Sequence, residues 1–249
     1  MQLKIKSDYD EMCRAAADFI TAYIRKNPAA LLCFPSGDTP TGVFKLLADH
    51  ARTGELDLKD CTFVGLDEWV GLDGSNEGSC RHYMDRHLFL PLGIEPDRIH
   101  FFNGAAADLE RECKRINAFI NEYGPVDLMM VGLGVNGHVG LNEPGVDFSL
   151  YANVSALDPK TKETARKYFK EEVSLTGGIT LGPRHFLESK VAVMIASGAK
   201  KAEVLVKVLK EEVTNAVPAS IIQRHHDAYI FIDSAAAALL SANDQNYEG

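Results

Sequence analysis

One glycine-rich stretch carries most of the reactive side chains of this chain. Residues 132–145 read Gly-Leu-Gly-Val-Asn-Gly-His-Val-Gly-Leu-Asn-Glu-Pro-Gly and follow the apolar run 126–131. His138 and Glu143 stand five residues apart across a sharp turn, and Asn136 comes just before the histidine. A glutamate that accepts one imidazole N–H fixes the tautomer of the ring and leaves the other nitrogen free to exchange protons. The stretch therefore predicts a histidine that works as a general acid or base.

The same glycines also allow a different interpretation. The spacing Gly-x-Gly-x-x-Gly over 132–137, directly after a strand, is typical of dinucleotide-binding turns. Such a turn must open an uninterrupted helix, and Pro144 follows too soon for one. The acidic residue expected about twenty positions later should end a strand, whereas Asp158 precedes Pro159 in a polar stretch. These features argue against a nucleotide site.

A carboxylate follows another apolar run, residues 61–66. Asp67 ends this predicted strand, and Glu68 should point to the opposite face because side chains alternate along a strand. A carboxylate in such a place is costly to desolvate unless it has partners or a task. One interpretation is capping of the next turn; the other is a general base for a carbon-bound proton, with a pKa raised by apolar surroundings.

Groups that could hold an anion lie in two other places. The loop Ser36-Gly37-Asp38-Thr39-Pro40 places Thr39 as the N-cap and Pro40 as the first helical residue. Its amides and hydroxyls either bind a phosphate or only cap the helix, and the loop alone favours the cap. Positive charge comes from three residues, which are Arg166, Lys200 and Lys201. The two lysines open a predicted helix, so at least one of them should face the ligand-binding crevice that the fold is expected to form.

Periodicity predicts the elements that position these side chains. Apolar stripes at helical spacing indicate helices over 12–23, 109–120 and 202–209. Short continuous apolar runs indicate strands at 30–34, 61–66, 126–131, 191–196 and 228–232. Strands that are apolar on both faces belong in a mostly parallel sheet covered by helices on each side. We therefore predict an α/β, doubly wound fold, a Rossmann-like three-layer sandwich, formed by residues 1–249 as one domain.

The polar turns that follow four of these strands should meet. In an open parallel sheet, ligands bind in the crevice at the carboxyl ends of the strands. One site would then collect the loop at 36–40, the carboxylate at 67, the histidine turn and a lysine. Residues 147–178 are charged and weakly periodic, which indicates an excursion over this site, either a mobile lid or a plain surface loop.

Composition limits the function classes. The 249 residues carry a formal charge of −9, so no general attraction to nucleic acid or an anionic membrane surface is expected. The five cysteines are scattered without a Cys-x-x-Cys pair, and His225-His226 has no third ligand at a plausible spacing, so no metal site is predicted. The N-terminus lacks the apolar core of a signal peptide and no window reaches a membrane span, so we expect a soluble, cytoplasmic protein. The sequence leaves open whether the chain forms a homo-oligomer.

Three motifs together resemble a known family. The turn at 132–145, the segment Leu66-Asp-Glu-Trp-Val-Gly-Leu72 and the loop at 36–40 occur in the order found in the glucosamine-6-phosphate deaminase/isomerase family. The resemblance extends over nearly the whole chain. The related 6-phosphogluconolactonases have a similar glycine-histidine turn that does not continue into Asn-Glu-Pro-Gly. Several segments favour the galactosamine-6-phosphate branch, namely Asp67–Val70, Gly78–Cys80, Asn136–His138, Gly178–Gly182 and Val217–Ser220.

The resemblance implies a mechanism and its residues. His138, oriented by Glu143 and Asn136, would open the sugar ring, and Asp67 would move a proton from C2 to C1 before ammonia leaves. The phosphate of this small-molecule substrate would be held by Ser36, Gly37, Asp38, Thr39, Arg166 and Lys201. No metal or organic cofactor would be needed.

Two other functions remain open at this level. One is a 6-phosphogluconolactonase-like hydrolase. The other is a non-catalytic sugar-phosphate sensor, as in some bacterial regulators, but the roughly thirty residues before the first core strand are too few for a helix-turn-helix module.

Overall fold

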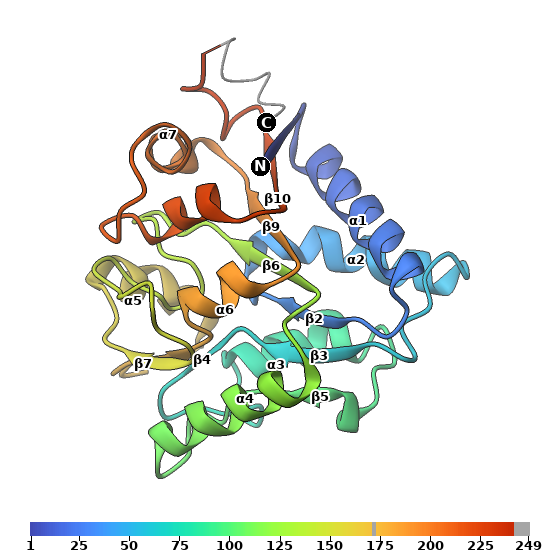
Figure 1. Ribbon diagram of the computed structural model, residues 1–249, viewed down its shortest axis with the longest axis vertical. Helices are drawn as coiled ribbons and strands as arrows, with labels where there is room; N and C mark the ends of the chain where they lie inside the picture. Colours follow the sequence, from blue (N-terminus) through green and yellow to red (C-terminus); the bar gives the residue numbers. More distant parts are fainter. Residues whose placement is uncertain (171–172, 242–249) are drawn as a thin grey trace.

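The computed structural model describes residues 1–170 and 173–241 (Figure 1). Its strands are β1 (Gln2–Lys6), β2 (Leu31–Phe34), β3 (Thr62–Gly65), β4 (Asp67–Trp69), β5 (Ile99–His100), β6 (Leu128–Gly132), β7 (Asn153–Ser155), β8 (Gly178–Thr180), β9 (Val191–Ala196) and β10 (Ala228–Asp233). Its α-helices are α1 (Tyr9–Lys26), α2 (Asp38–Arg52), α3 (Cys80–Met84), α4 (Leu109–Tyr123), α5 (Pro159–Ala165), α6 (Pro183–Glu188) and α7 (Ala202–Lys210). Its 3-10 helices are η2 (Pro96–Arg98), η3 (Arg166–Tyr168), η4 (Ala199–Lys201) and η5 (Pro218–Arg224), and η1 (Asp85–Phe89) is a short π-helix.

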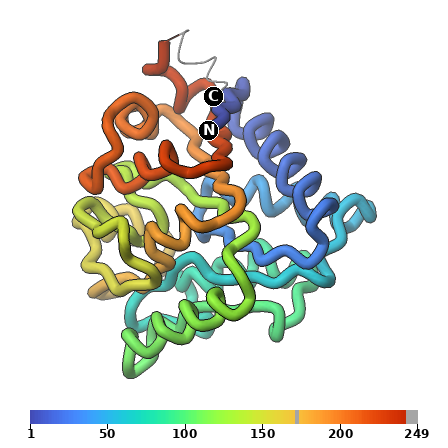
Figure 2. Tube along the Cα trace, viewed as in Figure 1, coloured from blue at the N-terminus to red at the C-terminus, as the bar shows by residue number. Residues whose placement is uncertain are grey.

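The main sheet has seven strands in the order β1-β10-β9-β6-β2-β3-β5. All of its strand pairs are parallel, with Met130 of β6 opposite Val193 of β9, for example. Figure 2 shows the first strand of the chain beside the last, because β1 pairs with β10. The five apolar runs expected to be strands all lie in this sheet.

Helices cover both faces of the sheet, because its strands are apolar on both faces. On β2, Leu31 and Cys33 point into a core shared with α4 and α7. Leu32 and Phe34 alternate with them and point into a second core shared with α1 and α2. In Figure 1, α1 and α2 lie to one side of the sheet and α7 to the other. The predicted α/β, doubly wound architecture is confirmed.

A second, three-stranded antiparallel sheet has the order β4-β8-β7. No apolar run predicts this sheet, since its strands have only three residues each. The interpretation that Asp67 ends a strand of the main sheet is therefore wrong. The chain leaves β3 at Gly65, and Asp67 opens β4, where it pairs with Thr180. The excursion expected over 147–178 carries β7, α5 and η3, although its residues 171–172 lie outside the described part.

The order of the strands places a crevice beside the sheet. From β2 the chain proceeds to β3 on one side, whereas from β6 it proceeds to β9 on the other. The carboxyl ends of β2 and β6 therefore flank the point at which the strand order reverses, where open α/β sheets bind their ligands. The 36–40 loop and the histidine turn follow these two strands.

No helix within the described residues is long and apolar enough to cross a membrane. All five cysteines are buried, and none of them forms a disulfide.

Candidate active site

A cavity of about 250 Å³ opens at the reversal point of the strand order. Six separate segments line it: the loop after β2, the start of β4, the start of α3, the histidine turn after β6, η4 after β9, and α5 with η3. The residues that supply polar or charged groups to its lining are Ser36, Asp38, Thr39, Asp67, Cys80, His138, Thr161, Thr164, Lys167, Tyr168 and Lys201. Tertiary folding thus brings the strand-end clusters together as the sequence predicted.

Asp67 contributes a buried carboxyl to this cavity. The residue is only 7% exposed. Burial raises the pKa of Asp67 to about 6, against opposing effects of a hydrogen bond with the Cys80 thiol and of positive charge on His138. A carboxyl with such a pKa is matched to proton transfer close to neutral pH. Asp67 therefore has the environment of a general base.

Glu68 has the other role considered for this segment. It points away from the cavity and is fully buried. Its carboxylate accepts the backbone N–H groups of Trp69 at 2.8 Å, and of Cys80 and Arg81 at 2.9 Å. These bonds hold the first turn of α3. The two adjacent carboxylates thus divide the two tasks, with Glu68 supporting the backbone and Asp67 facing the cavity.

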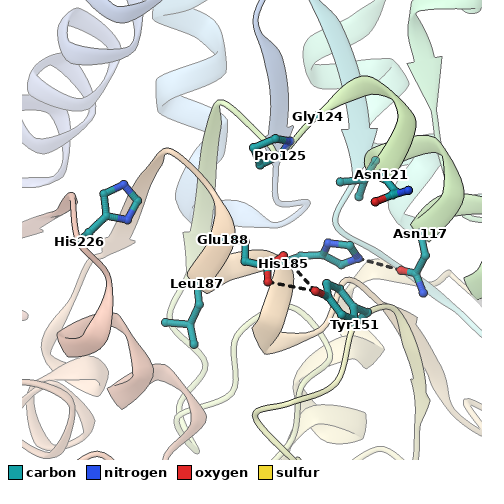
Figure 3. Close-up of a pocket in the computed structure, with 10 residues that line it drawn as sticks. Asn117, Asn121, Gly124, Pro125, Tyr151, His185, Leu187, Glu188 and His226 are labelled. Atoms are coloured by element: carbon teal, nitrogen blue, oxygen red, sulfur yellow. Dashed lines mark hydrogen bonds between the residues drawn. The ribbon is translucent and has the colours of Figure 1, made fainter.

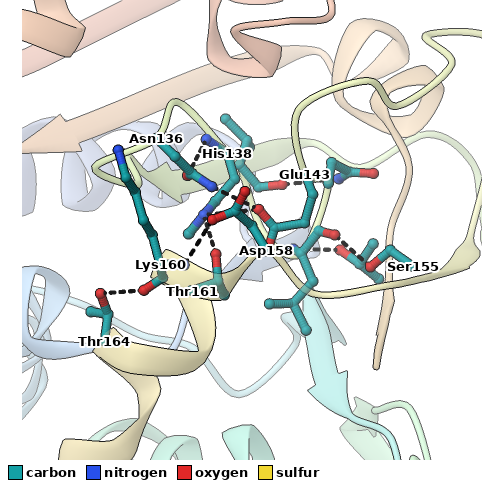
Figure 4. Close-up of polar contacts among 12 residues, drawn as sticks. Asn136, His138, Glu143, Ser155, Asp158, Lys160, Thr161 and Thr164 are labelled. Carbon is teal, nitrogen blue, oxygen red and sulfur yellow. Dashed lines mark hydrogen bonds and ion pairs between the residues drawn. The ribbon is translucent and has the colours of Figure 1, made fainter. Parts of the chain in front are cut away.

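His138 lies in a small polar cluster at the other side of the cavity (Figure 4). Its Nδ1 atom is 3.5 Å from Oε2 of Glu143 and 3.1 Å from the hydroxyl oxygen of Thr161. Burial would raise the pKa of Glu143, but hydrogen bonds with His138, Thr161 and Asn136 hold this pKa below its usual value. Glu143 is therefore an anion next to the imidazole.

Asn136 acts on this cluster in a different way from the one expected. Its amide nitrogen donates to Oε2 of Glu143 at 3.0 Å, and its Oδ1 accepts the backbone N–H of His138 at 3.2 Å. It therefore orients the glutamate and the backbone of the turn rather than the imidazole ring itself.

Gly134 allows the imidazole to lie flat against the backbone. A Cβ atom at this position would lie 2.5 to 2.6 Å from three atoms of the His138 ring, well inside contact distance. At Gly137 the backbone has φ = +88°, a region that favours glycine. The glycines that the sequence presents around the histidine are thus required by close approach and by turn geometry.

Replacing Gly134 with alanine is expected to push the imidazole out of place and lower turnover roughly 100-fold, as misplacement by about 1 Å can do. Gly132→Ala is the matched comparison, because nothing lies within 4 Å of its added Cβ. Steady-state rates and melting temperatures of both variants check this. Equal turnover in the two variants would contradict the assignment.

Two lysines supply positive charge to the cavity. Lys201 is half-buried, its Nζ donates to the carbonyl oxygen of Leu133, and burial lowers its pKa to about 8. Lys200 is exposed, so one of the two lysines faces the crevice, as predicted. Arg166, in contrast, is exposed and does not line the cavity; its neighbour Lys167 does, and pairs with Asp38.

The loop after β2 begins its helix earlier than predicted. Thr39 is not the N-cap: α2 starts at Asp38, and Gly37 occupies the cap position without a side-chain bond. Gly37 has φ = +125°, which turns the chain before Thr39 is reached. Its carbonyl oxygen accepts the hydroxyls of Thr41 at 3.1 Å and Tyr83 at 2.8 Å. The residues at the helix N-terminus nevertheless line the cavity, and a helix N-terminus favours an anion.

Several cavity residues escaped the sequence analysis. Cys80 had a signal only as part of a family motif, because its approach to Asp67 depends on the path of α3. Thr161, Lys167 and Tyr168 lie in the segment identified as an excursion, and no spacing rule selects them. Within the described residues, no group of three or more histidine, cysteine or acidic side chains is arranged to hold a metal ion.

A larger cavity, of about 780 Å³, lies at the opposite edge of the sheet (Figure 3). It is bordered by residues that precede β6, β9 and β10, including His226, and contains none of the predicted site residues. Four of its polar side chains already bond to one another: the Tyr151 hydroxyl bonds Glu188 at 3.0 Å, and His185 bonds Asn117 at 2.8 Å. The reactive groups are therefore in the smaller cavity.

Comparison with known proteins identifies the family. Residues 7–231 match the family model described as glucosamine-6-phosphate isomerases/6-phosphogluconolactonase. The chain belongs to this family. A glucosamine-6-phosphate deaminase of Clostridium perfringens (strain SM101) is 36% identical over 241 residues, 96% of this chain and 100% of that protein. Glucosamine-6-phosphate deaminase 2 of Bacillus subtilis (strain 168) is 35% identical over 245 residues, 97% of this chain and 98% of that protein.

Solved structures of this glucosamine-6-phosphate isomerase/6-phosphogluconolactonase family have the same fold. A monomeric glucosamine-6-phosphate deaminase superposes with a TM-score of 0.93 at 33% identity, covering 96% of this chain and all of that one. A 6-phosphogluconolactonase from Trypanosoma brucei superposes with a TM-score of 0.74 at 18% identity, covering 96% of this chain and 98% of that one. The second comparison supports the fold alone.

Proposed function

We propose that this protein is a hexosamine-6-phosphate deaminase, which converts a 2-amino-2-deoxyhexose 6-phosphate to a ketose 6-phosphate and ammonia. One observation carries the proposal: the Asp67 carboxyl and the His138 imidazole line one small cavity, near enough for charge on His138 to lower the pKa of Asp67. Deaminases of this family that are 35–36% identical over nearly the full chain support it.

His138 begins the reaction by opening the sugar ring. The imidazole takes the proton of the anomeric hydroxyl and returns a proton to the ring oxygen, so the C1–O5 bond breaks and an aldehyde forms at C1. Glu143 stabilises the transient imidazolium, since an adjacent anion favours the charged ring. No net proton is gained or lost in this step.

Asp67 then transfers hydrogen between two carbons. Its carboxylate removes the proton at C2 while the aldehyde oxygen at C1 gains the proton that the substrate ammonium gives up, which yields an enolamine, and the same carboxyl returns its proton to C1. The resulting imine at C2 adds water and releases ammonia, leaving the ketose. A base with a pKa of about 6 is suited to both directions of this transfer.

The phosphate is held at the side of the cavity opposite the reacting carbons. Lys201 and Lys167 bring positive charge, and the 36–39 loop presents the N-terminus of α2. In this proposal Lys167 takes the part that the sequence assigned to Arg166. Its ion pair with Asp38 keeps the lysine at the cavity edge before the anion arrives.

Galactosamine 6-phosphate is the proposed preferred substrate, and glucosamine 6-phosphate the next. The supporting segments at 67–70, 78–80 and 136–138 all contribute residues to the cavity wall or to the His138 cluster. Ammonia release from both epimers, measured as kcat/KM, tests the proposal. Higher kcat/KM with the glucosamine epimer would overturn the preference. Hydrolysis of 6-phosphogluconolactone without ammonia release from either epimer would overturn the deaminase.

Activity should fall in acid through the titration of Asp67. Its carboxyl must be ionised to accept the C2 proton, so kcat/KM is expected to decline as the pH drops through about 6. A pH profile with circular dichroism at each pH checks this. Unfolding should not account for the decline, because a carboxyl whose pKa is raised in the folded state stabilises that state as pH falls. An acidic midpoint near 3.8, the ordinary value, would contradict the role.

A further inference from the structure

The Thr161 hydroxyl lies within hydrogen-bond distance of His138, and it also helps to lower the pKa of Glu143, although Thr161 belongs to a different part of the chain. It lies in the first turn of α5, whereas His138 and Glu143 belong to the turn after β6. We propose that Thr161 is a positioning residue: its hydroxyl links Nδ1 of His138 to the Glu143 carboxylate and thereby sets the imidazole for proton transfer. The consequence for turnover rests on the proposed deaminase function.

The distances favour the hydroxyl over the carboxylate as the direct partner of the ring. Nδ1 of His138 is 3.1 Å from the Thr161 hydroxyl oxygen but 3.5 Å from Oε2 of Glu143. Hydrogen bonds from N–H to oxygen cluster between 2.7 and 3.2 Å, and they weaken beyond that. Threonine therefore completes a contact that the glutamate makes only at long range.

A hydroxyl can serve both neighbours at once. It has one proton to donate and two lone pairs to accept with. With Nδ1 protonated, Thr161 accepts that N–H and donates its own proton to Glu143, whose pKa is lowered in part by this bond. Nε2 of His138 is then unprotonated and free to take the proton of a sugar hydroxyl.

The surroundings hold Thr161 in this place. The residue is 5% exposed, and Asp158 caps the helix by accepting the N–H of Lys160 at 2.8 Å. Beyond α5, Lys167 forms an ion pair with Asp38 at the cavity, and Lys170 forms one with Glu77 outside the cavity lining. The orientation of the catalytic histidine thus depends on the seating of α5 over the site.

The test compares Thr161→Val and Thr161→Ser in the full chain. Valine keeps the branched shape but has no hydroxyl, and kcat is expected to fall roughly 10- to 100-fold, the value of a hydrogen bond to a charged group. Serine keeps the hydroxyl and should restore most of the activity. Thr21→Val is the matched control, because Thr21 is also buried and bonds Nδ1 of His50 at 2.8 Å, far from the cavity. Its kcat should equal that of the wild type.

A second readout separates positioning from stability and from the proposed function. In ¹⁵N NMR spectra of the substrate-free protein, the His138 ring should change its Nδ1-protonated signature in Thr161→Val and keep it in Thr161→Ser. Melting temperatures should stay close to wild type in both. An unchanged ring signature with wild-type kcat, or equal losses in the valine and serine variants, would overturn the proposal. Absence of ammonia release by the wild type would overturn the deaminase assignment, while the NMR result would still decide the role of Thr161.

Discussion

Asp67→Asn is expected to lower ammonia release roughly 10²- to 10⁴-fold, the contribution typical of a positioned general base. Asparagine has nearly the same shape but accepts no proton at C2, so the open-chain sugar phosphate would form and stay unreacted. Binding should survive, since the amide needs no charge in a buried place where ionisation is already costly. Single-turnover rates and calorimetric binding of a hexosamine 6-phosphate measure the two effects separately.

Exchange of the transferred hydrogen with solvent tests the role of Asp67 most directly. In deuterium oxide the wild type should introduce deuterium at C1 of the ketose product, and Asp67→Asn should not. Asp60→Asn is the control for loss of a carboxylate, because Asp60 is exposed and lies outside the cavity lining. Near-normal turnover or retained exchange in Asp67→Asn would exclude Asp67 as the base.

His138→Gln is expected to cost turnover on the same scale, roughly 10²- to 10⁴-fold, because the amide cannot shuttle a proton between the anomeric hydroxyl and the ring oxygen. The loss should concern the closed pyranose. A 2-amino-2-deoxyhexitol 6-phosphate, which has no ring to open, should bind the variant within a few-fold of wild type. Ammonia-release rates and titration calorimetry check the two statements.

The control for this histidine is His226→Gln. His226 lies at the second cavity, on the opposite edge of the sheet, and touches none of the proposed catalytic groups. Its replacement should leave ammonia release unchanged. If His226→Gln and His138→Gln lost activity equally, the effect would reflect general loss of a histidine, and the ring-opening role would be contradicted.

Much of this architecture follows from local sequence. Apolar runs of five or six residues and helical stripes depend only on side-chain hydrophobicity and on the two backbone periods. They therefore predicted the core strands of the seven-stranded sheet and its flanking helices. The need for glycines around His138 is also set by local backbone geometry. A backbone that must turn with positive φ, as at Gly137, or accept a ring against it, as at Gly134, admits no other residue without strain.

Contacts between distant segments could not be read in this way. Three-residue strands such as β4 and β8 exist only because they pair with each other, so no periodicity marks them. The helix that begins at Asp38, one residue before the predicted cap, follows the φ of Gly37, which the loop's environment selects. Arg166 and Lys167 are adjacent in sequence, and only the direction of the chain after α5 decides that the lysine faces the cavity.

The sequence by itself determined which residues were available for proton transfer and at which end of the sheet they would gather, because parallel strands deliver their following turns to one edge. Tertiary structure decided what each residue does there. Both Asp67 and Glu68 are buried, but Asp67 faces the cavity, whereas Glu68 accepts backbone amides of α3. The Thr161 hydroxyl reaches His138 from 23 positions away, since folding places α5 over the turn. Side-chain chemistry is local, whereas desolvation and hydrogen-bond partners are properties of the packed chain.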